Sequence, residues 1–196
     1  MRYGWFRRNA AALASLVLVI PVTGWWVTRP DYKSWYDAEP RDPVTVAAGG
    51  TSYAGATWYA ASVEVDPAPK RVGADEPTPP GTTRVRVYLR LQVDDLAKLK
   101  GLEGCRVHLR APDGRIWSDD IASGSYLDRP TGCAGGTDDK PATWRPKGTA
   151  EYYLKPRVGK PFETVAVFVV PTEDAKTAQP IVTWATRIPQ YLAFPR

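Results

Sequence analysis

Two hydrophobic patterns divide the chain. Residues 9–28 form an apolar run without a charged side chain, bounded by Arg8 and Arg29. Beyond residue 56, apolar and polar residues alternate with a period of two in several short segments. A long apolar run predicts a membrane-spanning helix, whereas alternation predicts strands of a sheet with one buried face. The sequence therefore predicts one N-terminal helix followed by a β domain.

The apolar run has the length and the borders of a signal anchor. At 1.5 Å of rise per residue it spans about 30 Å, the thickness of the hydrocarbon core. Trp25 and Trp26 end it, and indole rings favour the membrane interface. Bulky residues stand where a signal peptidase requires small ones, so we expect an uncleaved anchor; a cleaved, secreted protein is the alternative. The basic start predicts a cytoplasmic tail over residues 1–9 and a transmembrane anchor over residues 10–28.

The segment after the anchor is rich in proline, mixed charges and aromatic residues. We interpret residues 29–56 as a juxtamembrane linker and residues 57–196 as one extracytoplasmic domain in a single-pass protein of the cell membrane. Tyr32, Trp35 and Tyr36 either rest at the headgroup surface or pack on the domain.

The domain has strand signals at regular intervals, and the clearest is "TRVRVYLRLQV" (residues 83–93). Its apolar positions are Val85, Val87, Leu89 and Leu91, and its polar positions are Arg84, Arg86, Tyr88 and Arg90. The run at 162–171 is apolar on both faces and predicts a central, buried strand. A helical turn is expected around residues 94–102. About seven strands are predicted, at 57–65, 83–93, 105–110, 115–120, 150–156, 162–171 and 180–188. This predicts an all-β fold, an Ig-like antiparallel β-sandwich.

The order of these segments resembles a known group. "TRVRVYLRLQV", "CRVHLRAPDGRIW", a long loop and "ETVAVFVVPTEDAKTAQPIVTW" are similar to the telokin-like, immunoglobulin-fold domains of small exported bacterial proteins, the DUF4352-type and MPT63-like group. The resemblance covers residues 57–188, and the chain departs from it in the "PG-E" step expected before the apolar strand. It implies an Ig-like fold and export, and it implies no catalytic residues.

The two cysteines, Cys105 and Cys133, are predicted to form a disulfide, because an even pair in an exported protein is normally oxidised. The bridge would close a loop of about 29 residues, contribute about 3.5 kcal/mol and pin the Gly-rich loop to the sheet. Two free buried thiols are the alternative. The spacing is not that of a C-x-x-C redox site, and two cysteines with one histidine make a zinc site a poor fit.

The formal net charge of +5 is compatible with attraction to anionic surfaces but does not by itself predict it. Arginines occupy polar positions of two consecutive predicted strands. If those strands pair, these side chains would lie on one surface of the sheet. This candidate contact surface comprises Arg84, Arg86, Arg90, Arg106, His108 and Arg110. Its expected partners are anionic lipid, a phosphate-bearing wall polymer or an acidic protein; Glu64 or Glu151 could instead neutralise it. An exported location disfavours nucleic acid.

The sequence predicts no catalytic, cofactor-binding or metal-binding residues. His108, the only histidine, faces outward between two arginines, whose charge would keep it neutral. Three acidic doublets, at 94–95, 119–120 and 138–139, lack EF-hand spacing and suit turns; calcium binding there is left open. We therefore expect a non-enzymatic binding or scaffold module. A cell-envelope hydrolase or transferase is the alternative class, and the oligomeric state is not predicted.

Overall fold

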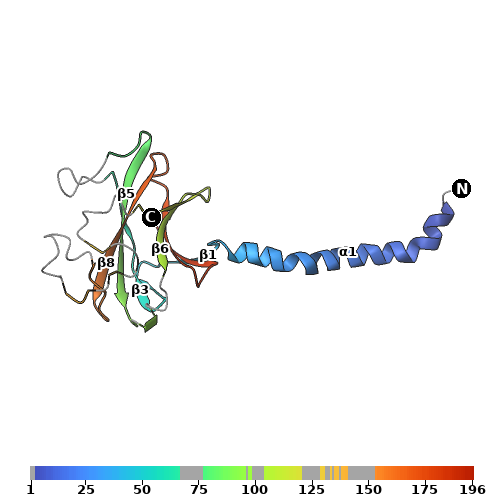
Figure 1. Cartoon of the computed structure of the whole chain (residues 1–196), viewed down its shortest axis with the longest axis horizontal. Coiled ribbons are helices and arrows are strands. Elements are labelled where there is room, and N and C mark those ends of the chain that lie inside the picture. The colour runs from blue at the N-terminus through green and yellow to red at the C-terminus, as the bar shows by residue number, and fades with distance from the viewer. Residues whose placement is uncertain are drawn as a thin grey trace.

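The structure is a computed structural model that describes residues 3–66, 77–95, 97–98, 104–120, 129–130, 133, 135–136, 138–140 and 153–196. Within these ranges one helix, α1 (Tyr3–Asp37), precedes a two-sheet domain (Figure 1). The strands are β1 (Asp42–Thr45), β2 (Thr51–Tyr53), β3 (Ala56–Trp58), β4 (Ser62–Val65), β5 (Thr82–Val93), β6 (Cys105–Arg110), β7 (Ile116–Ser118), β8 (Pro161–Pro171), β9 (Gln179–Trp184) and β10 (Gln190–Ala193).

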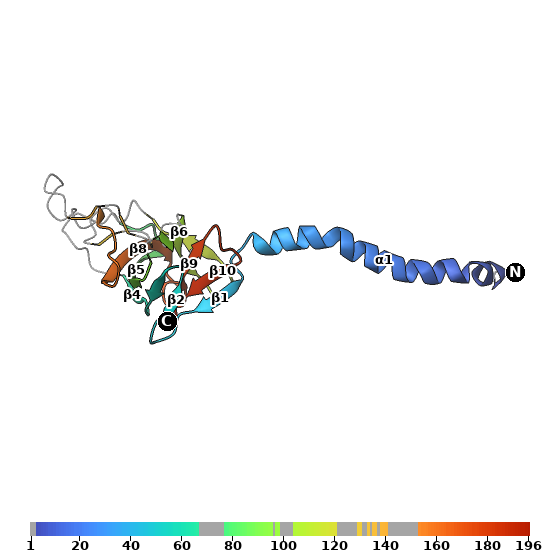
Figure 2. The ribbon, with the colours of Figure 1, turned by 90° about the horizontal axis from the view of Figure 1, so that it is seen from below.

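Helix α1 contains the whole apolar run and extends away from the sheets (Figures 1 and 2). It is long and apolar enough to cross a membrane, and none of its most apolar stretch is buried. It runs nine residues past the predicted end at residue 28. Tyr32 stacks near Trp35 and Tyr36, with ring centroids 5.8 and 6.2 Å apart, and side chains three and four residues apart support helical structure.

Residues 29–56 are not a linker, so that prediction is wrong. The first part belongs to α1, and the rest supplies β1 and β2. β1 pairs in parallel with β10, and Val46, just after it, is 1% exposed and donates its N–H to Ala193 O over 2.9 Å. Both strands are too short to give a periodic signal. β1 pairs with the distant β10, and β2 pairs with β3, which follows it directly.

The strands form two sheets. The β9 sheet has the order β1-β10-β9-β6-β7; in the β5 sheet the order is β2-β3-β5-β4, with β8 on the other edge of β5. The predicted strand 57–65 is interrupted at residues 59–61. The strands on either side of the interruption, β3 and β4, both pair with β5. The predicted strand 180–188 ends at Trp184, and after a turn that contains the cis bond Ile188–Pro189 the chain returns as β10.

The number of strands is therefore ten in the described ranges rather than about seven. β8 is buried on both faces as expected, yet it lies at the edge of its sheet and pairs only with β5. Its other edge bonds to loops: Val165 N donates to Pro130 O, and Asp120 N donates to Val167 O. Of the predicted strand 150–156, residues 153–156 are described, and Leu154 forms a single bridge with Asp138. Ala97 and Lys98 are helical, as expected of that turn, and Asp95 Oδ1 accepts from both amides.

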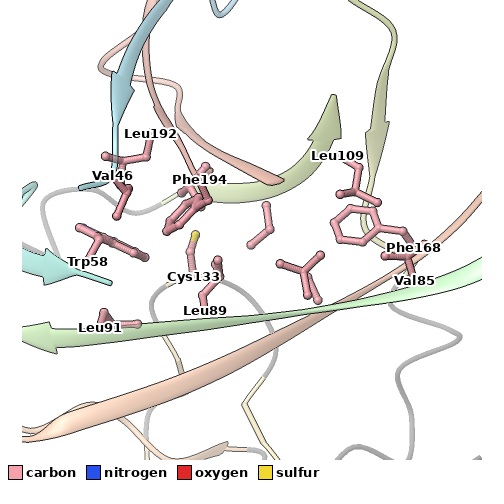
Figure 3. Close-up of a cluster of buried hydrophobic side chains, with 14 of the residues drawn as sticks. Val46, Trp58, Val85, Leu89, Leu91, Leu109, Cys133, Phe168, Leu192 and Phe194 are labelled. Atoms are coloured by element: carbon pink, nitrogen blue, oxygen red, sulfur yellow. The ribbon is translucent and has the colours of Figure 1, made fainter. Parts of the chain in front are cut away.

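The core fills the space between the two sheets (Figure 3). The indoles of Trp58 and Trp184 meet edge to face with centroids 5.7 Å apart, and Phe194 lies 6.3 Å from Trp58. Cys133, fully buried in this cluster, forms the predicted disulfide with Cys105 of β6, with Cα atoms 6.0 Å apart. The bridge therefore ties the loop after residue 130 into the centre of the domain.

Candidate anion-binding groove

The predicted contact surface does not exist as one surface. β5 pairs with β3, β4 and β8, whereas β6 pairs with β7 and β9, so the expectation that β5 and β6 pair is wrong. The chain passes from one sheet to the other between these strands. The arginines of β5 and those of β6 therefore lie on the outer faces of opposite sheets.

On β5, two of the three arginines are buried. Arg84 and Arg86 are 8% and 2% exposed, and only Arg90 is exposed to solvent. Glu64 of β4, which was considered as a neutralising residue, lies opposite Arg86 in the register. Glu163 of β8 lies opposite Arg90. Glu151, the other residue considered, lies outside the described residues. Arg84 and Arg86 thus belong to a packed layer and cannot form an exposed contact surface.

On β6, the side chains are tied to neighbouring strands. His108 is half-buried, with its Nε2 3.2 Å from Thr183 Oγ1 and its Nδ1 3.4 Å from Ser118 Oγ. Burial is the main cause that lowers its pKa, Arg106 adds to this, and Asp119 opposes it. Arg110 donates to Tyr191 Oη over 2.5 Å. Arg106 is exposed, so it is the member of this trio that solvent reaches freely.

Two adjoining open depressions, of about 430 and 190 Å³, lie where β5 ends and β8 begins. They share Leu154, Pro161 and Phe162 as an apolar floor. We call their union the basic groove. Its other lining residues are Arg90, Arg129, Pro130, Asp139, Lys155, Arg157, Lys160 and Glu163. β8 lies on the side of the domain that faces away from α1 (Figures 1 and 2).

Two of the five cations in the basic groove are neutralised by its two carboxylates. Arg129 Nε lies 2.8 Å from Glu163 Oε2, and Lys155 Nζ lies 2.7 Å from Asp139 Oδ1. The hydrogen bond from Lys155 lowers the pKa of Asp139. Both carboxylates of the basic groove are therefore paired with cations.

The other three cations are Arg90, Arg157 and Lys160. Among the residues that the structure describes, none of the three forms an ion pair with a carboxylate. Arg157 donates to the backbone oxygen of Asp139 over 3.0 Å, and the guanidinium of Arg90 lies 5.9 Å from the centre of the Tyr59 ring. The basic groove consequently presents three cations whose charge is available to an anion.

Two glycines let the wall of the basic groove form. Gly136 N donates to Leu154 O over 2.8 Å, and a Cβ at Gly136 would collide with the backbone of Tyr153. Gly135, at a φ of 75°, leaves no room for a Cβ beside the ring of Phe162. The glycine pair in "CAGG" (residues 133–136) was the sequence signal that could have pointed to this wall. The residues that line the basic groove come from separate segments, which only the fold brings together.

Two side chains of the acidic doublets have partners within the domain. Asp94 Oδ2 accepts from Thr57 Oγ1 over 2.9 Å, and Asp139 pairs with Lys155. Across the described ranges, no group of three or more His, Cys, Asp or Glu side chains is arranged to hold a metal ion.

The chain matches no protein-family model and no curated protein. Among solved structures it is similar to a conserved hypothetical protein from Bacillus anthracis, with 12% identity and a TM-score of 0.42 over 76% of this chain and 94% of that one. The resemblance to the telokin-like group therefore stays a prediction.

Proposed function

We propose that this protein is a single-pass membrane protein that holds an immunoglobulin-like β-sandwich outside the cytoplasm, where it acts as a non-enzymatic binding or scaffold module. One observation carries the proposal: only four residues separate an exposed apolar helix from the first strand of a disulfide-bonded domain. The disulfide favours an oxidising compartment, and the basic tail before the helix favours a cytoplasmic N-terminus. Trp25 and Trp26, 63% and 77% exposed, suit the membrane–water interface on the outer side of the cell membrane.

A set of contacts fixes the domain to the end of α1. Tyr36 Oη donates to Asp42 Oδ1 over 2.6 Å, and the guanidinium of Arg41 lies 3.8 Å from the centre of the Trp35 ring. The N–H groups of Arg41 and Asp42 both donate to Pro189 O. Since α1 continues for nine residues beyond Thr28, the domain would stand about 14 Å beyond the apolar run. Such a short, stiff stalk suits a module displayed close to the membrane.

The strand order supports the immunoglobulin-like assignment. The order β10-β9-β6-β7 corresponds to strands G, F, C and C′ of a variable-type domain, and β4-β5-β8 corresponds to A, B and E. The disulfide departs from this pattern, because it joins β6 to a loop rather than the strands equivalent to B and F.

The lining of the basic groove favours binding over catalysis. Its two carboxylates are already paired with cations, and the histidine of the chain lies on the opposite sheet. General acid–base chemistry at neutral pH needs a group whose pKa lies near the working pH, and the hydrogen bond from Lys155 instead lowers the pKa of Asp139. Surplus cations beside an apolar floor suit recognition of an anion instead.

Intact mass and thiol labelling of the full chain in its membrane test the proposal. We expect the full-length mass, no reaction of Cys105 and Cys133 with a membrane-impermeant maleimide in intact cells, and reaction of the partly exposed Cys105 once the bridge is reduced from outside. The variant Leu18→Arg, which places a charge near the bilayer centre, should release the chain or reduce its insertion, since that charge costs about 3 kcal/mol. Loss of the first two dozen residues would identify a secreted protein, and a Cys105 that reacts only after the membrane is permeabilised would place the domain inside.

A further inference from the structure

We infer that the basic groove binds a linear polyanion of the cell envelope, a polymer chain that carries phosphate or carboxylate groups, through Arg90, Arg157 and Lys160. The inference rests on the outward placement proposed above. The site inferred for the anion is the groove at the start of β8, in place of the arginine-bearing sheet face predicted from the sequence.

The arrangement of charge fits a chain. Arg90 lines the larger depression, Arg157 and Lys160 line the smaller one, and the apolar floor shared by both lies between them. A polymer whose anionic groups are separated by uncharged units can place one group at each end and its spacer on the floor. Both depressions are open, so a chain can enter and leave, whereas a small ligand would gain little burial.

The backbone around the basic groove disfavours an extended peptide. Such a peptide brings N–H and C=O groups that need partners when they are buried. Pro130 and Pro161 have no N–H, and Pro130 O already accepts from Val165. Leu154 O accepts from Gly136, and Lys155 N donates to Asp138 O. A polymer without backbone amides avoids this cost.

The position of the basic groove disfavours the lipid in which α1 would lie. β8 faces away from α1 in both views, and the contacts of Trp35 and Tyr36 with residues 41 and 42 hold that orientation (Figures 1 and 2). Headgroup attraction falls off within about 10 Å at 0.1 M salt. A groove on the far side of the domain therefore favours an anion from outside the membrane.

The test uses the full chain in nanodiscs of neutral lipid, with inorganic polyphosphate and polygalacturonate as probes. We expect binding of at least one polymer, weakening as salt rises with a slope of log affinity on log salt of about −2, the value that three contacts give on single-stranded nucleic acid. The variant Arg90→Gln/Arg157→Gln/Lys160→Gln should bind at least about tenfold more weakly and flatten that slope. The preferred polymer distinguishes phosphate from carboxylate.

A matched control removes the same charge elsewhere. Arg106→Gln/Lys176→Gln/Arg187→Gln changes three exposed cations outside the basic groove and should bind as the wild type does. Binding of neither polymer, or equal weakening in both triple variants, overturns the inference. So does groove-dependent binding of anionic vesicles, or of poly-L-glutamate as tightly as polygalacturonate. The mass and thiol labelling of the groove variant test the membrane placement separately, so failure of one proposal is distinguishable from failure of the other.

Discussion

The outer faces of the two sheets carry the same kind of sequence and have different environments. β5 and β6 both alternate apolar residues with arginines, and in both the apolar set faces the core. On the β5 sheet, however, Arg84 and Arg86 are buried together with Val165 and Val167 of β8. On the β9 sheet, Arg106 is exposed.

The two strands also differ in their neighbours within the sheet. β5 is flanked by β3 and β4 on one edge and by the whole length of β8 on the other. β6 lies next to β7, a strand of three residues, near the edge of its sheet. A period of two shows which residues share a face, but it does not show whether the face opposite the core meets water.

Removing the disulfide should have the largest effect. In Cys105→Ala/Cys133→Ala, the free energy of unfolding should fall by about 3.5 kcal/mol, because the bridge closes a long loop. Denaturant unfolding followed by near-ultraviolet circular dichroism measures the loss, and the reduced wild type is the control. Hydrogen exchange sharpens the comparison: the amide of Val165, bonded to Pro130 O, should lose more protection than the amides of β6. Unchanged stability would mean that the loop is held without the bridge.

A charge reversal on each outer face tests the comparison directly. Arg86→Glu places a carboxylate in a site that is 2% exposed and opposite Glu64, so we expect a loss of about 3 kcal/mol. Arg106→Glu, at an exposed position on the outer face of the β9 sheet, should leave the unfolding midpoint unchanged. Thermal unfolding of both variants measures this. Equal effects would show that the two faces do not differ in burial.

The sequence predicts what depends on local pattern and misses what depends on distant partners. The apolar helix, the inward residues of β5 and β6 and the cysteine pair could all be inferred, since each has a strong local or compositional signal. β1 and β10 could not, because each is four residues long and stabilised by pairing with the other. The basic groove was missed for a related reason: of its three free cations only Arg90 lies in the predicted surface, and the others come from the segment 157–160.

His108 gives the smallest and most specific effect, a pH dependence from the β9 sheet. Burial holds its folded pKa below the ordinary 6.5, so below that pH the unfolded chain takes up a proton that the folded chain resists. The free energy of unfolding should therefore fall as the pH is lowered from 7.5 to 5.5, and His108→Gln should remove this part of the slope. Ser118→Ala, which takes away a hydroxyl at 3.4 Å but no titrating group, should retain the slope. Identical slopes in wild type and His108→Gln would show that the imidazole is as well solvated in the folded domain as in the unfolded chain.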